Sequence, residues 1–225
     1  MSRLMECPET DCTAAAWTSD GSAILKGSPA GELKVWRPIG GSIETLHKMP
    51  RQKITAIAVS HDASLVAIGC ATGSVRVFNQ DDGCTDLGKH DAPVNVLAFK
   101  GRSDVLASAG EDRLIKTWNW RSKKNIATLS GHPERVTGIS WNPAGTRIAS
   151  VDAAVELRIR DPTSATLEFR RNVSGMSKYD SGLQGTLNGV AWSNDGRHIA
   201  TCGKGLAFQE GYGAVDVFRA ELPEK

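Results

Sequence analysis

Three residue types that together form a hydrolytic triad lie near the middle of the 225-residue chain, at His90, Ser108 and Asp112. In such a triad the histidine activates a serine that attacks an acyl carbon, and the acid orients the histidine. The serine must be accessible to a substrate. Ser108, however, lies in the run LASAG between apolar neighbours, where a β-strand would bury it. We therefore expect a structural role for these residues and no catalytic one.

Other potentially reactive groups have less support. The segment Gly203-Lys204-Gly205 lacks the spacing of a phosphate-binding loop and no helical pattern follows it. The five cysteines are odd in number and contain no C-x-x-C pair, and no histidine lies at metal-ligand spacing from them. We expect free, mostly buried thiols, no metal site and no cofactor.

Short apolar runs separated by polar turns recur along the chain with a regular period. Residues 90–131 contain four such runs, and the same unit is found before and after them. The first run of each unit ends at Trp17, Val59, Phe99, Trp141 or Trp192. These ends are roughly 40 residues apart, except for a longer last interval, and that period is typical of β-propeller blades. The sequence therefore predicts an all-β fold, a β-propeller of four-stranded antiparallel blades.

We expect a single domain over residues 1–225, with five blades at 12–49, 53–89, 90–131, 132–172 and 185–225. Residues 1–8 lie where a fourth strand would, while the last predicted strand is a third one. We therefore predict that residues 3–6 pair beside 214–218 and close a ring, which would cover exposed strand edges. Three arrangements fit the sequence: five blades that close, a piece of a longer propeller, and a ring completed by another chain.

The pair Gly131-His132, the run LASAGED and the aromatic ends of the third runs resemble the WD40-repeat family. In that family a His, a Ser or Thr, an Asp and a Trp form a buried hydrogen-bonded tetrad in each well-formed blade. The resemblance gives these places to His90, Ser108, Asp112 and Trp118. Such a tetrad has a physical reason, because buried N–H and O–H groups need partners.

The remaining blades depart from this pattern, so the sequence predicts one complete tetrad. The fourth blade has Ile159 where tryptophan is usual and lacks the turn aspartate. The residues that match the pattern are Trp36 in the first blade, Phe78 in place of tryptophan in the second, His132 and Ser150 in the fourth, and Thr201 with Phe218 in the fifth.

Two insertions interrupt the regular loops, RNVSGMSKYDSGLQG before the fifth blade and CGKGLAFQEGYGA within it. Both replace loops that meet at the tetrad, so we expect both on one face of the propeller. Loops on a rigid scaffold often bind partners, and Met, aromatic and basic side chains suit such contacts. The predicted partner-binding residues are Met176, Lys178, Tyr179, Lys204, Phe208, Tyr212, Glu134 and Arg135. The alternatives are tolerated flexible loops and, for Glu134 and Arg135, solvated charges.

The composition narrows the function classes. The net charge is +2, with basic and acidic residues interspersed, so we expect no direct nucleic-acid and no membrane contact. The chain shows no apolar signal segment, which favours the cytoplasm or nucleus. The inner runs AAAW, AIAV, VLAF, GISW and GVAW are small and apolar, which argues against an enzyme site in the channel.

The resemblance implies a non-catalytic protein–protein interaction scaffold, a subunit of a larger assembly with other proteins as partners and no small-molecule substrate. The alternative is a regulatory or ligand-sensing propeller module of a larger multidomain protein, or a fragment of a seven-bladed propeller.

Overall fold

The computed structural model describes residues 7, 9, 11–173, 185–204 and 213–220. All regular elements in these ranges are β-strands. In chain order they are β1 Ala14–Trp17, β2 Ile24–Gly27, β3 Glu32–Arg37, β4 Ser42–Lys48, β5 Ile54–Val59, β6 Leu65–Cys70, β7 Ser74–Asn79, β8 Gly83–Lys89, β9 Val94–Phe99, β10 Val105–Gly110, β11 Ile115–Asn119, β12 Lys124–Leu129, β13 Val136–Trp141, β14 Ile148–Asp152, β15 Glu156–Arg160, β16 Leu167–Asn172, β17 Thr186–Trp192, β18 His198–Lys204 and β19 Gly213–Arg219.

The strands form five antiparallel sheets, each a simple meander of consecutive strands. The sheets are β1–β4, β5–β8, β9–β12, β13–β16 and β17–β19, and we name them blades 1 to 5 in this order. Blades 1 to 4 have four strands, and blade 5 has three within the described residues. The predicted all-β fold of propeller blades is therefore confirmed.

The sequence also located the strand ends well. The first strands β1, β5, β9, β13 and β17 end at the predicted residues, from Trp17 through Trp192. Each third strand ends one residue beyond the predicted position, as in β11, which ends at Asn119 after Trp118. This agreement arises because period-two apolar runs and polar turns mark a blade without reference to distant contacts.

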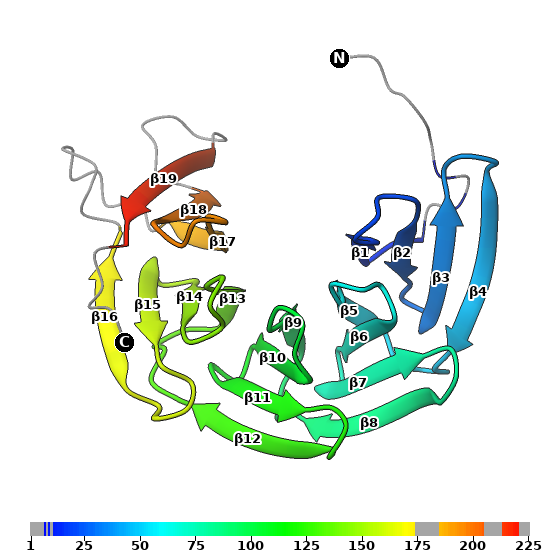
Figure 1. The fold of residues 1–225 in the computed structure, drawn as a ribbon, viewed down its shortest axis with the longest axis horizontal. Coiled ribbons are helices and arrows are strands. Elements are labelled where there is room, and N and C mark those ends of the chain that lie inside the picture. The colour runs from blue at the N-terminus through cyan, green and yellow to red at the C-terminus, as the bar shows by residue number, and fades with distance from the viewer. Residues whose placement is uncertain (1–6, 8, 10, 174–184, 205–212, 221–225) are drawn as a thin grey trace.

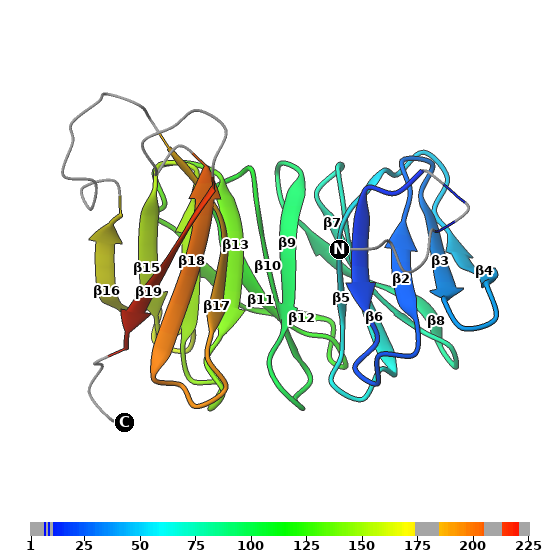
Figure 2. The same ribbon diagram turned by 90° about the horizontal axis from the view of Figure 1, so that it is seen from above.

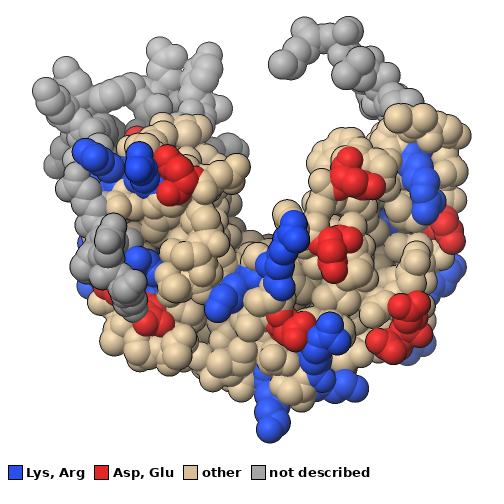
Figure 3. All heavy atoms as spheres, in the orientation of Figure 1, with Lys and Arg blue, Asp and Glu red and all other residues tan. Residues whose placement is uncertain are grey.

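The blades stand side by side in an arc, with their first strands along the inner side (Figure 1). Neighbouring blades pack through these strands, β1 on β5, β5 on β9, β9 on β13 and β13 on β17. Within the described residues the arc is open between blade 5 and blade 1, as Figure 3 shows. The predicted pairing of residues 3–6 beside 214–218 falls outside the described residues, because residues 1–6 are not among them.

The hydrophobic core consists of separate clusters, one at each junction of two blades. The cluster between blades 1 and 2 contains Leu33 and Ile68, and the cluster between blades 2 and 3 contains Val75 and Leu106. Blades 3 and 4 share Ile115 with its neighbours, and blades 4 and 5 share a fourth cluster. Burial of these apolar side chains stabilises the contact of one blade with the next.

The cysteines are free, as predicted, but most are not buried. Only Cys70 is buried, while Cys12 and Cys202 are exposed and Cys7 and Cys84 are intermediate. The expectation of mostly buried thiols is therefore wrong. Cys202 lies on the side of β18 that faces away from blade 4, and the other side of this strand holds the buried Ile199 and Thr201.

Candidate functional site

The structure brings His90, Ser108, Asp112 and Trp118 together in blade 3. His90 Nδ1 lies 2.8 Å from Asp112 Oδ2, and His90 Nε2 lies 2.7 Å from Ser108 Oγ. The indole Nε1 of Trp118 donates to the same Ser108 Oγ, also at 2.7 Å. The four side chains thus form one continuous hydrogen-bonded chain from the Asp112 carboxylate to the Trp118 indole.

The proton positions in this chain follow from its partners. Asp112 accepts from Nδ1 of His90, so Nε2 is left as the acceptor of the Ser108 hydroxyl proton. Ser108 Oγ then accepts from Trp118 Nε1, so the polar groups of all four side chains take part in hydrogen bonds. Burial lowers the pKa of His90, although the Asp112 carboxylate acts in the opposite direction. The imidazole is therefore neutral at physiological pH.

This geometry supports a structural role. Ser108 is 0% exposed and already bonded on both sides, so no substrate atom can approach its oxygen. Asp112 also accepts from the backbone N–H of Leu114 and of Asp91. These bonds tie the β10–β11 turn to the loop that enters β9. Close contact there requires Gly110, since a Cβ on this residue would lie 2.1 Å from the carbonyl oxygen of Pro93.

Blade 4 contains more of this arrangement than the sequence analysis expected. His132 Nδ1 lies 2.8 Å from Asp152 Oδ2, and His132 Nε2 lies 2.8 Å from Ser150 Oγ. The β14–β15 turn has no aspartate, as expected, but Asp152, the last residue of β14, takes that place beside the histidine.

The residue in the tryptophan place of blade 4 is Arg160, not Ile159. Ser108 lies two residues beyond Leu106, which pairs with Trp118, and Ser150 lies two residues beyond Ile148, which pairs with Arg160. Trp118 lies ten residues after Ser108, and the same count from Ser150 gives Arg160, so the sequence spacing identifies this place. Arg160 is 8% exposed, and its guanidinium donates to the carbonyl oxygen of Ser130 at 2.8 Å.

A charged cluster surrounds Arg160 on the same side of β15. Glu156 is buried and bonds to Arg158, and its carboxylate also accepts from Arg170 at 2.8 Å. Buried charges persist only where they are paired, and this carboxylate satisfies two guanidinium groups. The cluster replaces the aromatic packing of blade 3, and it was not among the features predicted from the sequence.

In blades 1 and 5 the tetrad is incomplete, and some buried polar atoms have no partner among the residues that the structure describes. Lys26 lies in the serine place of blade 1, since it pairs with Lys34 as Ser108 pairs with Lys116. Among the described residues, the indole Nε1 of Trp36 then has no acceptor. In blade 5, Thr201 is buried and its hydroxyl likewise lacks a described partner.

The turns that meet at the tetrads define one face of the arc, which we call the tetrad face. Asn172, the end of β16, pairs with Glu156 beside the β14–β15 turn, and Lys204 pairs with Thr186 and Gly213. The four strand ends that flank the two insertions therefore lie on the tetrad face (Figure 2). Of the predicted binding residues within the insertions, Lys204 ends β18. Met176, Lys178, Tyr179, Phe208 and Tyr212 lie outside the described residues.

Glu134 and Arg135 lie on the tetrad face between blades 3 and 4, and both are exposed. Arg135 Nε lies 3.7 Å from Glu111 Oε1, and Glu111 also accepts from the amide of Asn95 at 3.2 Å. These groups are spread over an open surface. Within the described ranges, no group of three His, Cys, Asp or Glu side chains could hold a metal ion.

A family model described as "WD domain, G-beta repeat" matches residues 42–79, 84–119, 123–154 and 178–206, which together make up more than half of the chain. The chain belongs to the WD40-repeat family. WD40 propellers are generally non-catalytic, and they generally bind other proteins.

Several named proteins are similar to this WD40 chain at modest identity. Protein HIR1 of Phaeosphaeria nodorum is 25% identical over 212 residues, which cover 80% of this chain and 20% of that protein. The p21-activated protein kinase-interacting protein 1-like of Danio rerio is 28% identical over 148 residues, 64% of this chain and 36% of that protein. Polyadenylation factor subunit 2 of Candida albicans is 27% identical over 114 residues, 50% of this chain and 21% of that protein. The matches thus span only 20% to 36% of the length of these relatives.

No helix that could cross a membrane occurs in the part of the chain that the structure describes.

Proposed function

We propose that this protein is a non-catalytic scaffold that holds other proteins in a larger assembly, and that partners bind its tetrad face. The observation that supports this most is the position of the two insertions, whose flanking strand ends emerge together on that face. Loops held on a rigid frame are where binding sites commonly lie. In blade 4, which precedes the first insertion, the hydrogen bonds of His132 to Ser150 and Asp152 form part of such a frame.

The comparisons support the same proposal. One relative is named as kinase-interacting and another as a subunit of a polyadenylation factor, and both names describe proteins that act together with others. The small apolar inner strands and the mixed surface charge in Figure 3 fit protein partners better than a catalytic channel or a nucleic-acid surface. Five free cysteines fit a reducing compartment, so we expect the protein in the cytoplasm or nucleus.

The test is affinity purification from cell extract with quantitative mass spectrometry. The double variant Phe208→Ala and Tyr212→Ala should fold normally and lose captured partners at least fivefold, because aromatic anchors often dominate interface energies. The control is Ile39→Ala, a change at an 89% exposed residue in the β3–β4 turn on the opposite face. Equal capture by the double variant and the parent chain would reject the tetrad face as the binding surface.

A second candidate function is that of a regulatory or ligand-sensing module within a larger protein, including a fragment of a longer propeller. The observation that favours it is the small part of each relative that the match covers. The measurement is the mass of the endogenous protein in cell extract. A mass equal to that of the 225-residue chain would reject the second candidate.

A further inference from the structure

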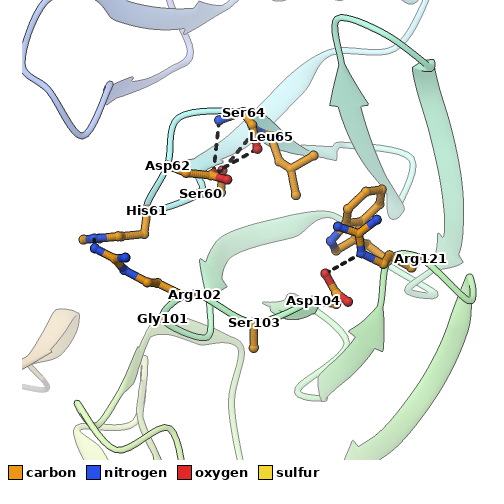
Figure 4. A pocket seen from close by; sticks show the side chains of 11 residues that line it. Ser60, His61, Asp62, Ser64, Leu65, Gly101, Arg102, Ser103, Asp104 and Arg121 are labelled. Atoms are coloured by element: carbon orange, nitrogen blue, oxygen red, sulfur yellow. Dashed lines mark hydrogen bonds and ion pairs between the residues drawn. The ribbon is translucent and has the colours of Figure 1, made fainter.

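A pocket of about 380 Å³ opens between blades 2 and 3, on the face opposite the tetrad face (Figure 4). It is formed by the β5–β6 turn, the β9–β10 turn and the residues that follow β11. Its size falls within the range of sites that hold a few residues of a peptide or a small ligand. In the sequence, both turns have the pattern of ordinary connections between strands.

The two acidic side chains in the pocket wall are already engaged. Asp62 accepts from the Ser60 hydroxyl at 2.6 Å and from the Ser64 hydroxyl and backbone N–H. These hydrogen bonds lower the pKa of Asp62 to about 2, so the carboxylate remains ionised within its own turn. Asp104 accepts from Arg121 Nε at 2.8 Å on the other side of the pocket.

Arg102 differs from Arg121 in the kind of side chain that it contacts. Its Nη2 lies 3.0 Å from His61 Nε2, and the two side chains point toward each other across the pocket rim. A guanidinium has no acceptor, so Arg102 donates and a neutral His61 accepts. Among the described residues, no carboxylate forms an ion pair with Arg102. The cation thus has a neutral partner and free donors.

The wall opposite Arg102 adds a second binding element. The guanidinium of Arg121 lies 4.7 Å from the ring centre of Trp120, and Trp120 packs in part against the core between blades 2 and 3. This stack presents a flat surface at the pocket wall. A peptide chain can lie along it while one of its side chains reaches Arg102.

We propose that this pocket binds an acidic segment of a partner protein, with one carboxylate held by the guanidinium of Arg102. A carboxylate matches the planar fork of an arginine and would supply the charge that His61 does not. A phosphate fits less well, because it carries about twice the charge and the carboxyl groups of Asp62 and Asp104 lie in the same wall. Arg102 would be the residue that selects the acid.

This site is separate from the tetrad face, so the two proposals can fail independently. The turns that form the pocket follow the carboxyl ends of β5 and β9, whereas the tetrad turns lie at the opposite ends of these strands. The double variant Phe208→Ala and Tyr212→Ala should therefore keep full binding at the pocket.

The test uses peptide arrays of the form X-X-Z-X-X, acetylated and amidated, where X is an equal mixture of residues and Z is Glu, Gln or phosphoserine. The labelled 225-residue chain should bind the Glu array at least fivefold better than the Gln array. A further array with Gln at Z and a free C-terminal carboxylate shows whether a chain terminus serves equally well.

Variants of the chain then assign the effect to Arg102. Arg102→Gln should remove the preference for Glu, and Arg102→Lys should keep part of it. The matched control is Arg37→Gln, an exposed arginine paired with Glu44 away from the pocket. Equal binding of the Glu and Gln arrays, tighter binding of the phosphoserine array, or an unchanged preference in Arg102→Gln would each overturn the proposal.

Discussion

Ser108 connects the two halves of the hydrogen-bonded chain in blade 3, so its loss should destabilise the protein strongly. In Ser108→Ala, Trp118 Nε1 loses its acceptor and His90 Nε2 loses its donor, and both are buried. Leaving a buried polar group unpaired costs about 1–3 kcal/mol, so two such groups cost about 2–6 kcal/mol. In a chain of this length, that lowers the melting temperature by at least about 4 °C.

Blade 5 offers a matched control for this experiment. Thr201 occupies the serine place there, is 1% exposed, and has a hydroxyl without a partner among the described residues. In Thr201→Val a methyl group replaces that hydroxyl at nearly constant volume. Because no hydrogen bond is lost, the free energy of unfolding should stay unchanged or rise by up to about 1–2 kcal/mol.

Urea unfolding followed by far-ultraviolet circular dichroism measures both variants against the parent chain. Equal slopes in urea would show that the change lies in stability and not in the surface exposed on unfolding. If Ser108→Ala unfolds at the same urea concentration as the parent, the hydrogen-bonded chain carries no net stability. If Thr201→Val loses as much unfolding free energy as Ser108→Ala, the loss comes from removing any buried hydroxyl and not from breaking the hydrogen-bonded network.

Two further predictions concern titration and thiol reactivity. The pKa of His90 is lowered in the folded chain, whereas in the unfolded chain it lies near the ordinary value of about 6.5. The unfolded chain therefore binds a proton at this imidazole more readily. The stability linked to His90 is present above that pH and falls as the pH drops toward the folded-state pKa. Melting temperatures from pH 8 to pH 5 check this, and a profile that rises toward acid would contradict it. Burial raises the pKa of Cys70, so iodoacetamide should modify the exposed Cys12 and Cys202 in the native chain long before Cys70. Mass spectrometry of peptides after timed alkylation measures the order, and early modification of Cys70 would show that blade 2 opens readily.

The sequence predicted what depends on local patterns and missed what depends on register and on contacts between blades. Strand ends such as Trp141 follow from alternating apolar residues and a polar turn, and they were located correctly. Asp152 was missed because it reaches His132 from a strand position two residues after Ser150, and its side-chain direction depends on how β13 and β14 pair. Arg160 was missed by an error of one residue, which the spacing from Ser150 would have corrected.

The pocket beside Arg102 could not be read from the sequence for a different reason. Its walls come from turns roughly 40 residues apart, and each turn alone is an ordinary connection. Only the packing of β5 against β9 brings them together. The insertions were recognised from their lengths, whereas their conformation lies outside the described residues.

The open arc has a mechanical consequence. Strand pairing stays within each blade. The junctions between blades are held by apolar side chains, which are less directional, and by single hydrogen bonds such as that from Thr55 Oγ1 to the carbonyl oxygen of Val94. A slight rotation at each junction breaks no strand pairing, and because the junctions act in series, their rotations add along the arc. The distance between blades 1 and 5 is therefore the softest dimension of the described molecule. A partner bound between blades 1 and 5 would change their spacing only by bending all the junctions along the arc. A partner bound at a single junction would restrict motion at that junction alone.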